Sequence, residues 1–278
     1  MKSKRIDPSW ISTPVLLVVF VLAWHFYVVY FHISKFILPP PLAVWQSLIE
    51  LLNTQSTWHH LWITVYETVV GFVVACVIGI GLGTFLGKIY WLERAVNPFI
   101  IATQVVPKVA LVPLFILWFG FGPEAKIVVA AVLAFFPILT NTVLGVKSVE
   151  RGHRDVMTVM NATRWQSFTS LELPSSLPTI LAGMEVGIVL ALIGAVVGEY
   201  LGGSTGLGHL LVASLNDYKV GAMFAVIFLL TAVGFVPLEN LVGRAEFIFF
   251  SVDATSPWWE VWEWPFEIRW TRLFSSIN

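Results

Sequence analysis

The sequence predicts an all-α integral membrane protein with six transmembrane helices and a cytoplasmic loop between the fourth and fifth. Of its 278 residues, 57% are hydrophobic and only 12% are charged, whereas a soluble domain averages about 25% charged residues. Six apolar segments are also long enough to cross a bilayer, which takes about 20 residues. The net charge of −1 gives no reason to expect nucleic acid as a partner.

The six predicted spans follow one another at 12–31, 61–87, 97–119, 125–146, 178–200 and 220–243. The first follows a basic start, but its apolar run is too long for a signal peptide, so we expect a retained helix. The third contains Pro107 and Pro113 and is predicted to be kinked. The chain then divides into 1–35 with the first helix, an outer loop 36–60, a transporter core 61–245 and a tail 246–278.

Two features between the predicted spans have their own pattern. The outer loop carries Pro39-Pro40-Pro41, which stops a helix, and then amphipathic spacing up to Leu52, which favours a short interfacial helix. The second span carries Gly79, Gly83 and Gly87 at intervals of four. Such a ridge predicts close approach by a neighbouring helix.

The distribution of Lys and Arg sets the expected orientation. With the N-terminus inside, twelve of these residues fall on cytoplasmic segments, Lys108 lies within a span, and the outer loops hold Lys35, Lys126 and Lys219. This bias places both termini and the 147–177 loop in the cytoplasm. We therefore expect a multi-pass membrane protein in contact with lipid.

The 147–177 loop contains a spaced motif. Asp155 is followed by Asn161, then Leu171, then Leu173-Pro174. The stretch resembles the cytoplasmic loop of ATP-binding-cassette importer permeases, which runs Glu-Ala-Ala, three residues, Gly, nine residues, Ile, any residue, Leu-Pro. The spacings all hold, with Asp at the Glu, Asn at the Gly and Leu at the Ile.

Other segments carry the same resemblance, over about residues 36–245. They are Leu38 to Pro41 with Val44-Trp45, Leu117 to Gly120, Phe135 to Ile138, Ile180 to Gly183, and Gly206-Leu207-Gly208. Together they are similar to the permeases of nitrate, taurine, sulfonates and pyrimidine or thiamine precursors. The resemblance implies a homodimer of six-helix subunits in the bacterial inner (cytoplasmic) membrane, two copies of a cassette ATPase inside, and a periplasmic or lipid-anchored solute-binding protein outside.

The resemblance assigns the contact with the ATPase to Asp155, Val156, Met157, Val159, Met160, Asn161, Ala162, Arg164, Leu173 and Pro174. We expect two short helices at an angle, with the Val and Met side chains forming an adaptable apolar knob. Asp155 is expected at the N-terminal end of the first helix, where a carboxylate is favoured. Asn161 is expected to take the left-handed turn of the family glycine. The alternative is an ordinary solvated loop.

The energy source is expected to lie outside this chain. No stretch matches the Gly-x4-Gly-Lys-Ser/Thr loop that cradles phosphates, and Gly87-Lys88 lacks both the upstream glycine and the hydroxyl. We predict no enzyme activity and no cofactor here, with ATP and Mg bound by the partner ATPase. The six histidines show no metal-ligand spacing, so we predict no metal site. The resemblance implies alternating access.

Ionisable groups inside a span usually face a partner or a cavity, and four of them stand out here: Glu67, Lys108, Glu185 and Glu199. In one interpretation Lys108 neutralises Glu67 or Glu185 and the set holds helices together. In the other the four line the translocation path. The family often has Arg near 67 and 185, so the reversed sign favours a larger polar organic solute over nitrate. Glu199 precedes a glycine-rich stretch that could form an outer gate or a plain loop.

The tail 246–278 contains five of the thirteen tryptophans, interspersed with glutamates. Tryptophan favours the membrane interface, so we expect the tail along the inner surface. The sequence as a whole predicts the permease subunit of an ATP-driven, binding-protein-dependent importer of a small polar organic or anionic solute, such as a sulfonate, nitrate or a pyrimidine precursor. An ion-coupled secondary carrier or channel is the alternative.

Overall fold

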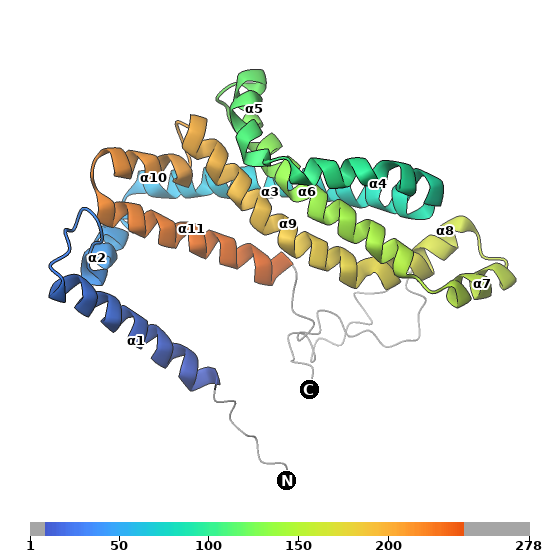
Figure 1. Ribbon diagram of the computed structural model, residues 1–278, viewed down its shortest axis with the longest axis horizontal. Helices are drawn as coiled ribbons and strands as arrows, with labels where there is room; N and C mark the ends of the chain where they lie inside the picture. Colours follow the sequence, from blue (N-terminus) through green and yellow to red (C-terminus); the bar gives the residue numbers. More distant parts are fainter. Residues whose placement is uncertain (1–8, 242–278) are drawn as a thin grey trace, which may run out of the picture. The chain divides into compact units, whose positions relative to one another are not determined.

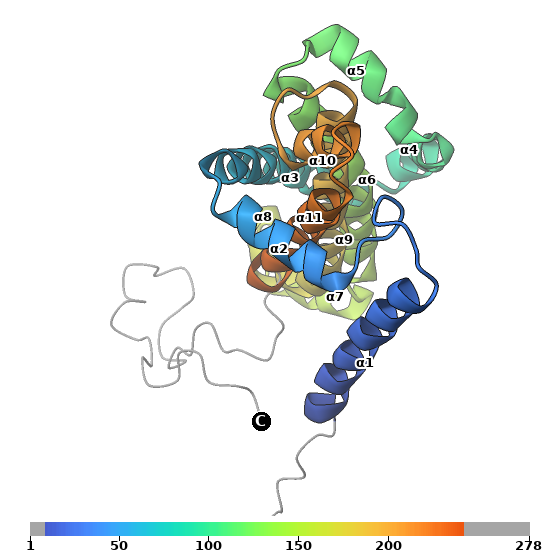
Figure 2. The same cartoon turned by 90° about the vertical axis from the view of Figure 1, so that its left-hand side faces the viewer.

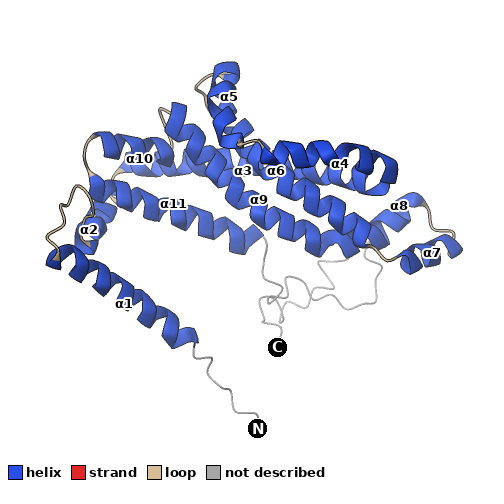
Figure 3. Ribbon diagram, in the orientation of Figure 1, coloured by secondary structure: helices blue, strands red, loops and turns tan. Residues whose placement is uncertain are grey.

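The computed structural model describes residues 9–241, and of residues 9–13, 151 and 235–241 only the backbone. Over this range the chain consists of helices and connecting loops (Figure 3). The helices are α1 (Ser9–Tyr30), α2 (Pro41–Leu52), α3 (Gln55–Lys88), α4 (Tyr90–Val105), the 3₁₀ turn η1 (Lys108–Leu111), α5 (Val112–Phe119), α6 (Pro123–Ser148), α7 (Arg151–Val159), α8 (Arg164–Ser167), the π-helical segment η2 (Phe168–Glu172), α9 (Leu173–Gly202), α10 (Leu207–Asn216) and α11 (Val220–Leu241). The predicted interfacial tail 246–278 lies outside the described residues.

Three long helices, α3, α6 and α9, pack against one another and form the core (Figures 1 and 2). The predicted glycine ridge is confirmed, because Gly79, Gly83 and Gly87 of α3 face Ile138, Thr142 and Val146 of α6. The facing residues rise in order along both helices, so α3 and α6 run parallel. Glycine lets the two backbones approach more closely than any side chain would allow.

Helix α9 packs on α6 through a second set of glycines. Gly183, Gly187 and Gly194 of α9 lie against Asn141, Ile138 and Ala130 of α6. Here the facing numbers fall as α9 advances, so α9 runs antiparallel to α6. All three core helices therefore share one end, where Lys88, Ser148 and Leu173 lie. We call it the loop end, because α7 and α8 connect there.

The segment predicted as a kinked third span is a broken pair of helices. The helices Tyr90–Val105 and Lys108–Phe119 meet at 80°. Pro107 precedes η1 with a non-helical ψ of 90°, and the preceding Val106 is extended. Proline disfavours the helical conformation in the residue before it, which accounts for the position of the break.

The predicted outer helix is confirmed as α2, which begins with Pro41 at its first position. Proline is favoured there because the first amide of a helix has no intrahelical partner. Helices α2, α10 and α11 share an apolar cluster of buried residues with partly buried neighbours: Leu207, Val226, Leu229 and Val233, with Leu48 and Leu51 of α2 packed against them. The interfacial position of α2 stays a prediction.

By length and composition, three helices in the described range could cross a membrane, or four if the bent pair counts as one: Gln55–Lys88, Pro123–Ser148 and Arg164–Gly202, with Tyr90–Phe119 as the fourth. Shorter apolar helices cover Pro14–Tyr30 and Val220–Gly234. The count of six spans therefore stays a prediction. One placement was wrong: Lys126 is not in an outer loop but buried in the second turn of α6.

Candidate functional site

The loop that resembles a docking motif folds into two short helices at the loop end. Glu150 precedes α7 in an extended conformation, and α7 ends at Val159. Asn161 then takes a φ of 53°, the left-handed conformation that the sequence predicted for it. Thr163 opens α8 with a capping box, in which its hydroxyl accepts from the Gln166 amide and its own amide donates to the Gln166 side chain. Reciprocal capping of this kind fixes where a short helix starts.

One expected detail of this loop was wrong. Asp155 does not lie at the N-terminal end of the first helix, because α7 begins four residues earlier, at Arg151. Asp155 is exposed on the body of the helix instead. It is therefore beyond reach of the free amides that a capping carboxylate would satisfy.

The α7–α8 loop exposes a set of large apolar side chains. Val156, Val159 and Met160 lie on one face of α7 and its end, at spacings of three and four. Val159 is 83% exposed, and Trp165 of α8 is 71% exposed. We call these four residues the α7–α8 patch. Exposed apolar side chains grouped on one short motif are typical of an interaction site.

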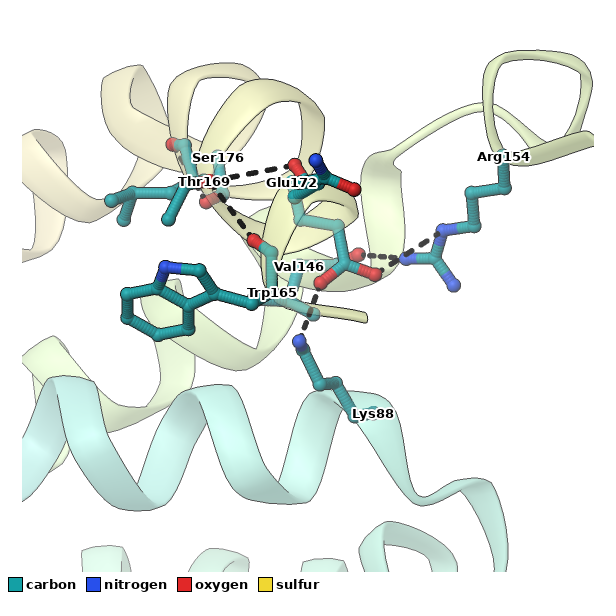
Figure 4. A network of polar contacts seen from close by, with 9 residues as sticks. Lys88, Val146, Arg154, Trp165, Thr169, Glu172 and Ser176 are labelled. Atoms are coloured by element: carbon teal, nitrogen blue, oxygen red, sulfur yellow. Dashed lines mark hydrogen bonds and ion pairs between the residues drawn. The ribbon is translucent and has the colours of Figure 1, made fainter. Parts of the chain in front are cut away.

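A polar network ties the α7–α8 loop to the core helices (Figure 4). Glu172, at the end of η2, is buried between two cations. Its Oε2 lies 2.7 Å from the Nζ of Lys88, the last residue of α3. Its Oε1 lies 4.0 Å from the Nε of Arg154 on α7. The Nη2 of Arg154 also donates to the Val146 carbonyl of α6 at 2.7 Å. This network, which we call the Glu172 node, joins four elements.

Local structure places Glu172 in the node. The segment Phe168–Glu172 is π-helical, and such widened turns recur at functional positions. The ammonium of Lys88 lies 4.3 Å from the centre of the Phe168 ring on the same segment. A cation over an aromatic face is attracted by the ring's negative centre. Lys88 therefore contacts η2 at both of its ends.

A second polar cluster lies at the opposite end of the core. Glu67 of α3 pairs with Lys126 of α6 at 3.4 Å, and both side chains are buried. Glu199 of α9, also buried, accepts from the Thr64 hydroxyl at 2.6 Å and from the Gly208 amide at 2.7 Å. Buried charges need a compensating partner, which is the Lys126 ammonium for Glu67 and two hydrogen-bond donors for Glu199. The cluster therefore fastens α3, α6, α9 and the start of α10 together.

The remaining predicted path residues lie elsewhere. Lys108, on η1, is half-buried with its ammonium 4.8 Å from the centre of the Phe136 ring. Glu67 therefore pairs with Lys126, and not with Lys108 as one interpretation of the sequence had it. Glu185 is exposed on α9, between glycines that face α6. The four predicted path charges thus fall in three separate surroundings.

Sequence reasoning did not select Lys88, Arg154 or Glu172. A usable signal existed, because Glu172 is the one acidic residue between Asp155 and Glu185 and directly precedes Leu173-Pro174. An isolated acid at the border of an apolar helix needs a partner. The sequence could not supply the identity of that partner, since Lys88 lies 84 positions away.

Comparison with known proteins identifies the family. The family described as "Binding-protein-dependent transport system inner membrane component" matches residues 75–241. The chain belongs to this family. Its members include ABC importer permeases, and the segment matched contains α6, the α7–α8 loop and α9.

Individual relatives agree with this. The permease is 36% identical over 218 residues to the formylaminopyrimidine transport permease protein ThiX of Halalkalibacterium halodurans, covering 75% of this chain and 86% of the relative. It is 35% identical over 249 residues to the riboflavin transport system permease protein RibX of Chloroflexus aurantiacus, covering 87% and 93%. An inward-facing structure of the MetNI methionine ABC transporter matches with a TM-score of 0.57 at 20% identity, covering 67% of this chain and 95% of that one. That likeness supports the fold.

Proposed function

We propose that this permease is the membrane-spanning subunit of an ATP-driven importer, and that a cassette ATPase docks on the α7–α8 patch. The observation that carries the proposal is the patch itself. Apolar side chains that include the 83%-exposed Val159 project from a loop with the family's motif spacing. The same loop is fastened to α3 and α6 by the Glu172 node. A partner that moves this loop would therefore move the core.

The course of the chain supports six crossings. Because α3 and α6 run parallel, the chain must return across the bilayer between them, and α4 with α5 is the segment available. Helix α9 then crosses back, which leaves α1 and α11 as the first and last spans. The bias in Lys and Arg puts the loop end, and both termini, in the cytoplasm. That is the compartment in which an ATPase with bound ATP and Mg would meet the patch.

The assembly we propose has two copies of this chain, two ATPase subunits inside and a solute-binding protein outside. ATP binding would draw the two α7–α8 loops together and open the dimer outward, and hydrolysis would reset it. Energetically, the nucleotide shifts the equilibrium between two states by binding them with different affinity. In this proposal the chain supplies the translocation path and the α7–α8 loop that transmits the movement of the ATPase.

For the solute, the proposal favours a polar organic molecule over nitrate. The two relatives described above carry formylaminopyrimidine and riboflavin in their names. Lys108 and Glu185 offer one cation and one anion outside the buried cluster, which suits a solute with both hydrogen-bond donors and acceptors. Glu67 and Glu199 are buried within one subunit, and this favours a structural role for them.

The test is copurification of the ATPase with tagged permease from its native membrane, with mass spectrometry of the bound proteins. The double substitution Val159→Asp, Met160→Asp should abolish recovery, because it places charge where an apolar contact forms. Trp165→Ala should weaken recovery, whereas Trp91→Ala should not, although both tryptophans are 71% exposed. Recovery of a permease dimer without ATPase, even after cross-linking, would contradict the proposal and favour an ion-coupled carrier.

A further inference from the structure

We infer that Glu172 is a positioning residue that transmits movement of the docking helix α7 to α3 and α6. The inference rests on the proposed function, since it takes the ATPase to act on the α7–α8 patch. The role we infer for Glu172 involves no contact with nucleotide or solute. It acts through Lys88 and Arg154, which it holds at 2.7 and 4.0 Å.

Arg154 is the residue that carries α7 into this node. Among the side chains that the structure describes on α7, only Arg154 makes a hydrogen bond or ion pair with another long element. The ion contact of His153 stays local, to Glu150 at 3.8 Å. Apart from the chain connection to α6, the polar ties from α7 to the core therefore run through one guanidinium, whose several N–H groups let it donate to the Val146 carbonyl and also form an ion pair with Glu172.

The Val146 carbonyl is a fitting second acceptor. It lies in the last turn of α6, where carbonyls lack an intrahelical donor. A cation at the C-terminal end of a helix is also favoured by the helix dipole. Arg154 is thus bound to the end of α6 directly, and to the end of α3 through Glu172 and Lys88.

Beyond the node, α3 and α6 are built to move as one body. Gly83 and Gly87 would place a Cβ within 3.0 Å of Thr142 and Val146, so the helices are already in close contact near the node. Interfaces packed this tightly shift as units and do not deform smoothly. From Lys88 to Trp62 at the far end of α3 is about 39 Å, at 1.5 Å for each residue. The node can therefore act across the whole membrane thickness.

The experiment places one cysteine reporter on each side of the node. In a Cys76→Ala background, His153→Cys reports on α7 and Trp62→Cys, at an exposed position, reports on the far end of α3. The full complex with its copurified ATPase is reconstituted in nanodiscs. The rate of modification by a polar maleimide is measured for each reporter, without nucleotide and with Mg-ATP plus vanadate. In the otherwise unchanged permease, nucleotide should alter both rates.

Glu172→Gln should keep the nucleotide response at His153→Cys and lose it at Trp62→Cys, with ATPase still bound. Glu172→Asp, which keeps the charge, should restore at least part of the distant response. Glu93→Gln is the matched control. The ion pair between Glu93 of α4 and Lys147 of α6, at 3.1 Å, also joins two helices but includes no residue of α7. Glu93→Gln should leave both responses intact.

The outcomes separate the two proposals. If Glu172→Gln leaves the Trp62→Cys response unchanged while ATPase is bound, the inference is overturned and the proposed function stands. If no ATPase accompanies the unchanged permease, the proposed function fails and the inference falls with it. Should Glu172→Gln not elute as a folded complex, Lys88→Met provides the second variant. Failure of both to fold would make the node a folding element and overturn the inference.

Discussion

Gly83→Ala should separate α3 from α6, because the structure leaves no room for a Cβ at this position. A Cβ at this position would lie 2.6 Å from the Thr142 Cβ, 2.8 Å from its Cγ2 and 3.0 Å from the Leu139 carbonyl oxygen. Carbon atoms pack best at about 3.5–4.0 Å. The helices must therefore part by about 1 Å at this point, because the nearest contact is to a Cβ that no rotamer change can move.

Two terms set the magnitude. Overpacking a tight contact costs about 1–3 kcal/mol, and Thr142 has little room to adjust because its hydroxyl donates to the Ile138 carbonyl at 2.7 Å. Replacing glycine by alanine in a helix returns up to about 1 kcal/mol of helix propensity. Gly81→Ala is the matched control, since nothing lies within 4 Å of its Cβ. The two variants should therefore differ by about 1–3 kcal/mol.

The assay is thermal unfolding of the two purified variants in the same detergent. A difference of 1–3 kcal/mol corresponds to about 2–12 °C in Tm, by the scaling of about 2–4 °C for each kcal/mol in chains of this size class. Gly83→Ala should melt below Gly81→Ala by that amount. Equal Tm values for the two variants would mean that α3 and α6 are not held as closely at Gly83 as the structure has them.

Two further substitutions follow from the geometry. Asn161→Ala should weaken ATPase binding about 5- to 30-fold, because a left-handed backbone costs alanine about 1–2 kcal/mol. Asn161→Gly should bind as well as the parent. Equal affinity of the two variants in a binding titration would contradict the role of the φ of 53° at this residue. Lys126→Met should destabilise the fold by about 3–5 kcal/mol, because it leaves the Glu67 charge buried alone. Adding Glu67→Gln should recover most of that loss in thermal unfolding, and a double variant no better than the single one would count against the pair.

Local patterns in the sequence were enough to predict several elements. The glycine interval of four predicted a close helix contact, and the structure supplies α6 as the neighbour. Pro107 and Pro113 predicted a kink in the third span, which the structure places as a break after Val105, and Asn161 predicted its own left-handed turn. Each of these depends on a residue's backbone preferences or on spacing along one helix. Such properties are present in the sequence before any folding.

Pairings between distant residues could not be predicted in the same way. Lys108 was the expected cation for Glu67 or Glu185, but the packing of α6 beside α3 brings Lys126 to Glu67 instead. Glu172 meets Lys88 because two helix ends converge at the loop end, which no local pattern encodes. The misplaced Asp155 has a related cause. Helix α7 starts earlier than its apolar residues suggest, so the expected cap falls on the helix body.

The distribution of polar contacts along the core helices bears on how the permease can move. One network, around Glu172, fastens α3, α6 and α7 at the loop end, and the other, around Glu67 and Glu199, fastens α3, α6, α9 and α10 at the opposite end. Between the two networks, glycines hold the helices so close together that a Cβ would clash with the facing helix. A core fixed at both ends and tight in the middle leaves little freedom for sliding within one subunit. For the proposed transport cycle, this arrangement favours rigid-body rotation of the subunit against its surroundings over sliding of helices within it.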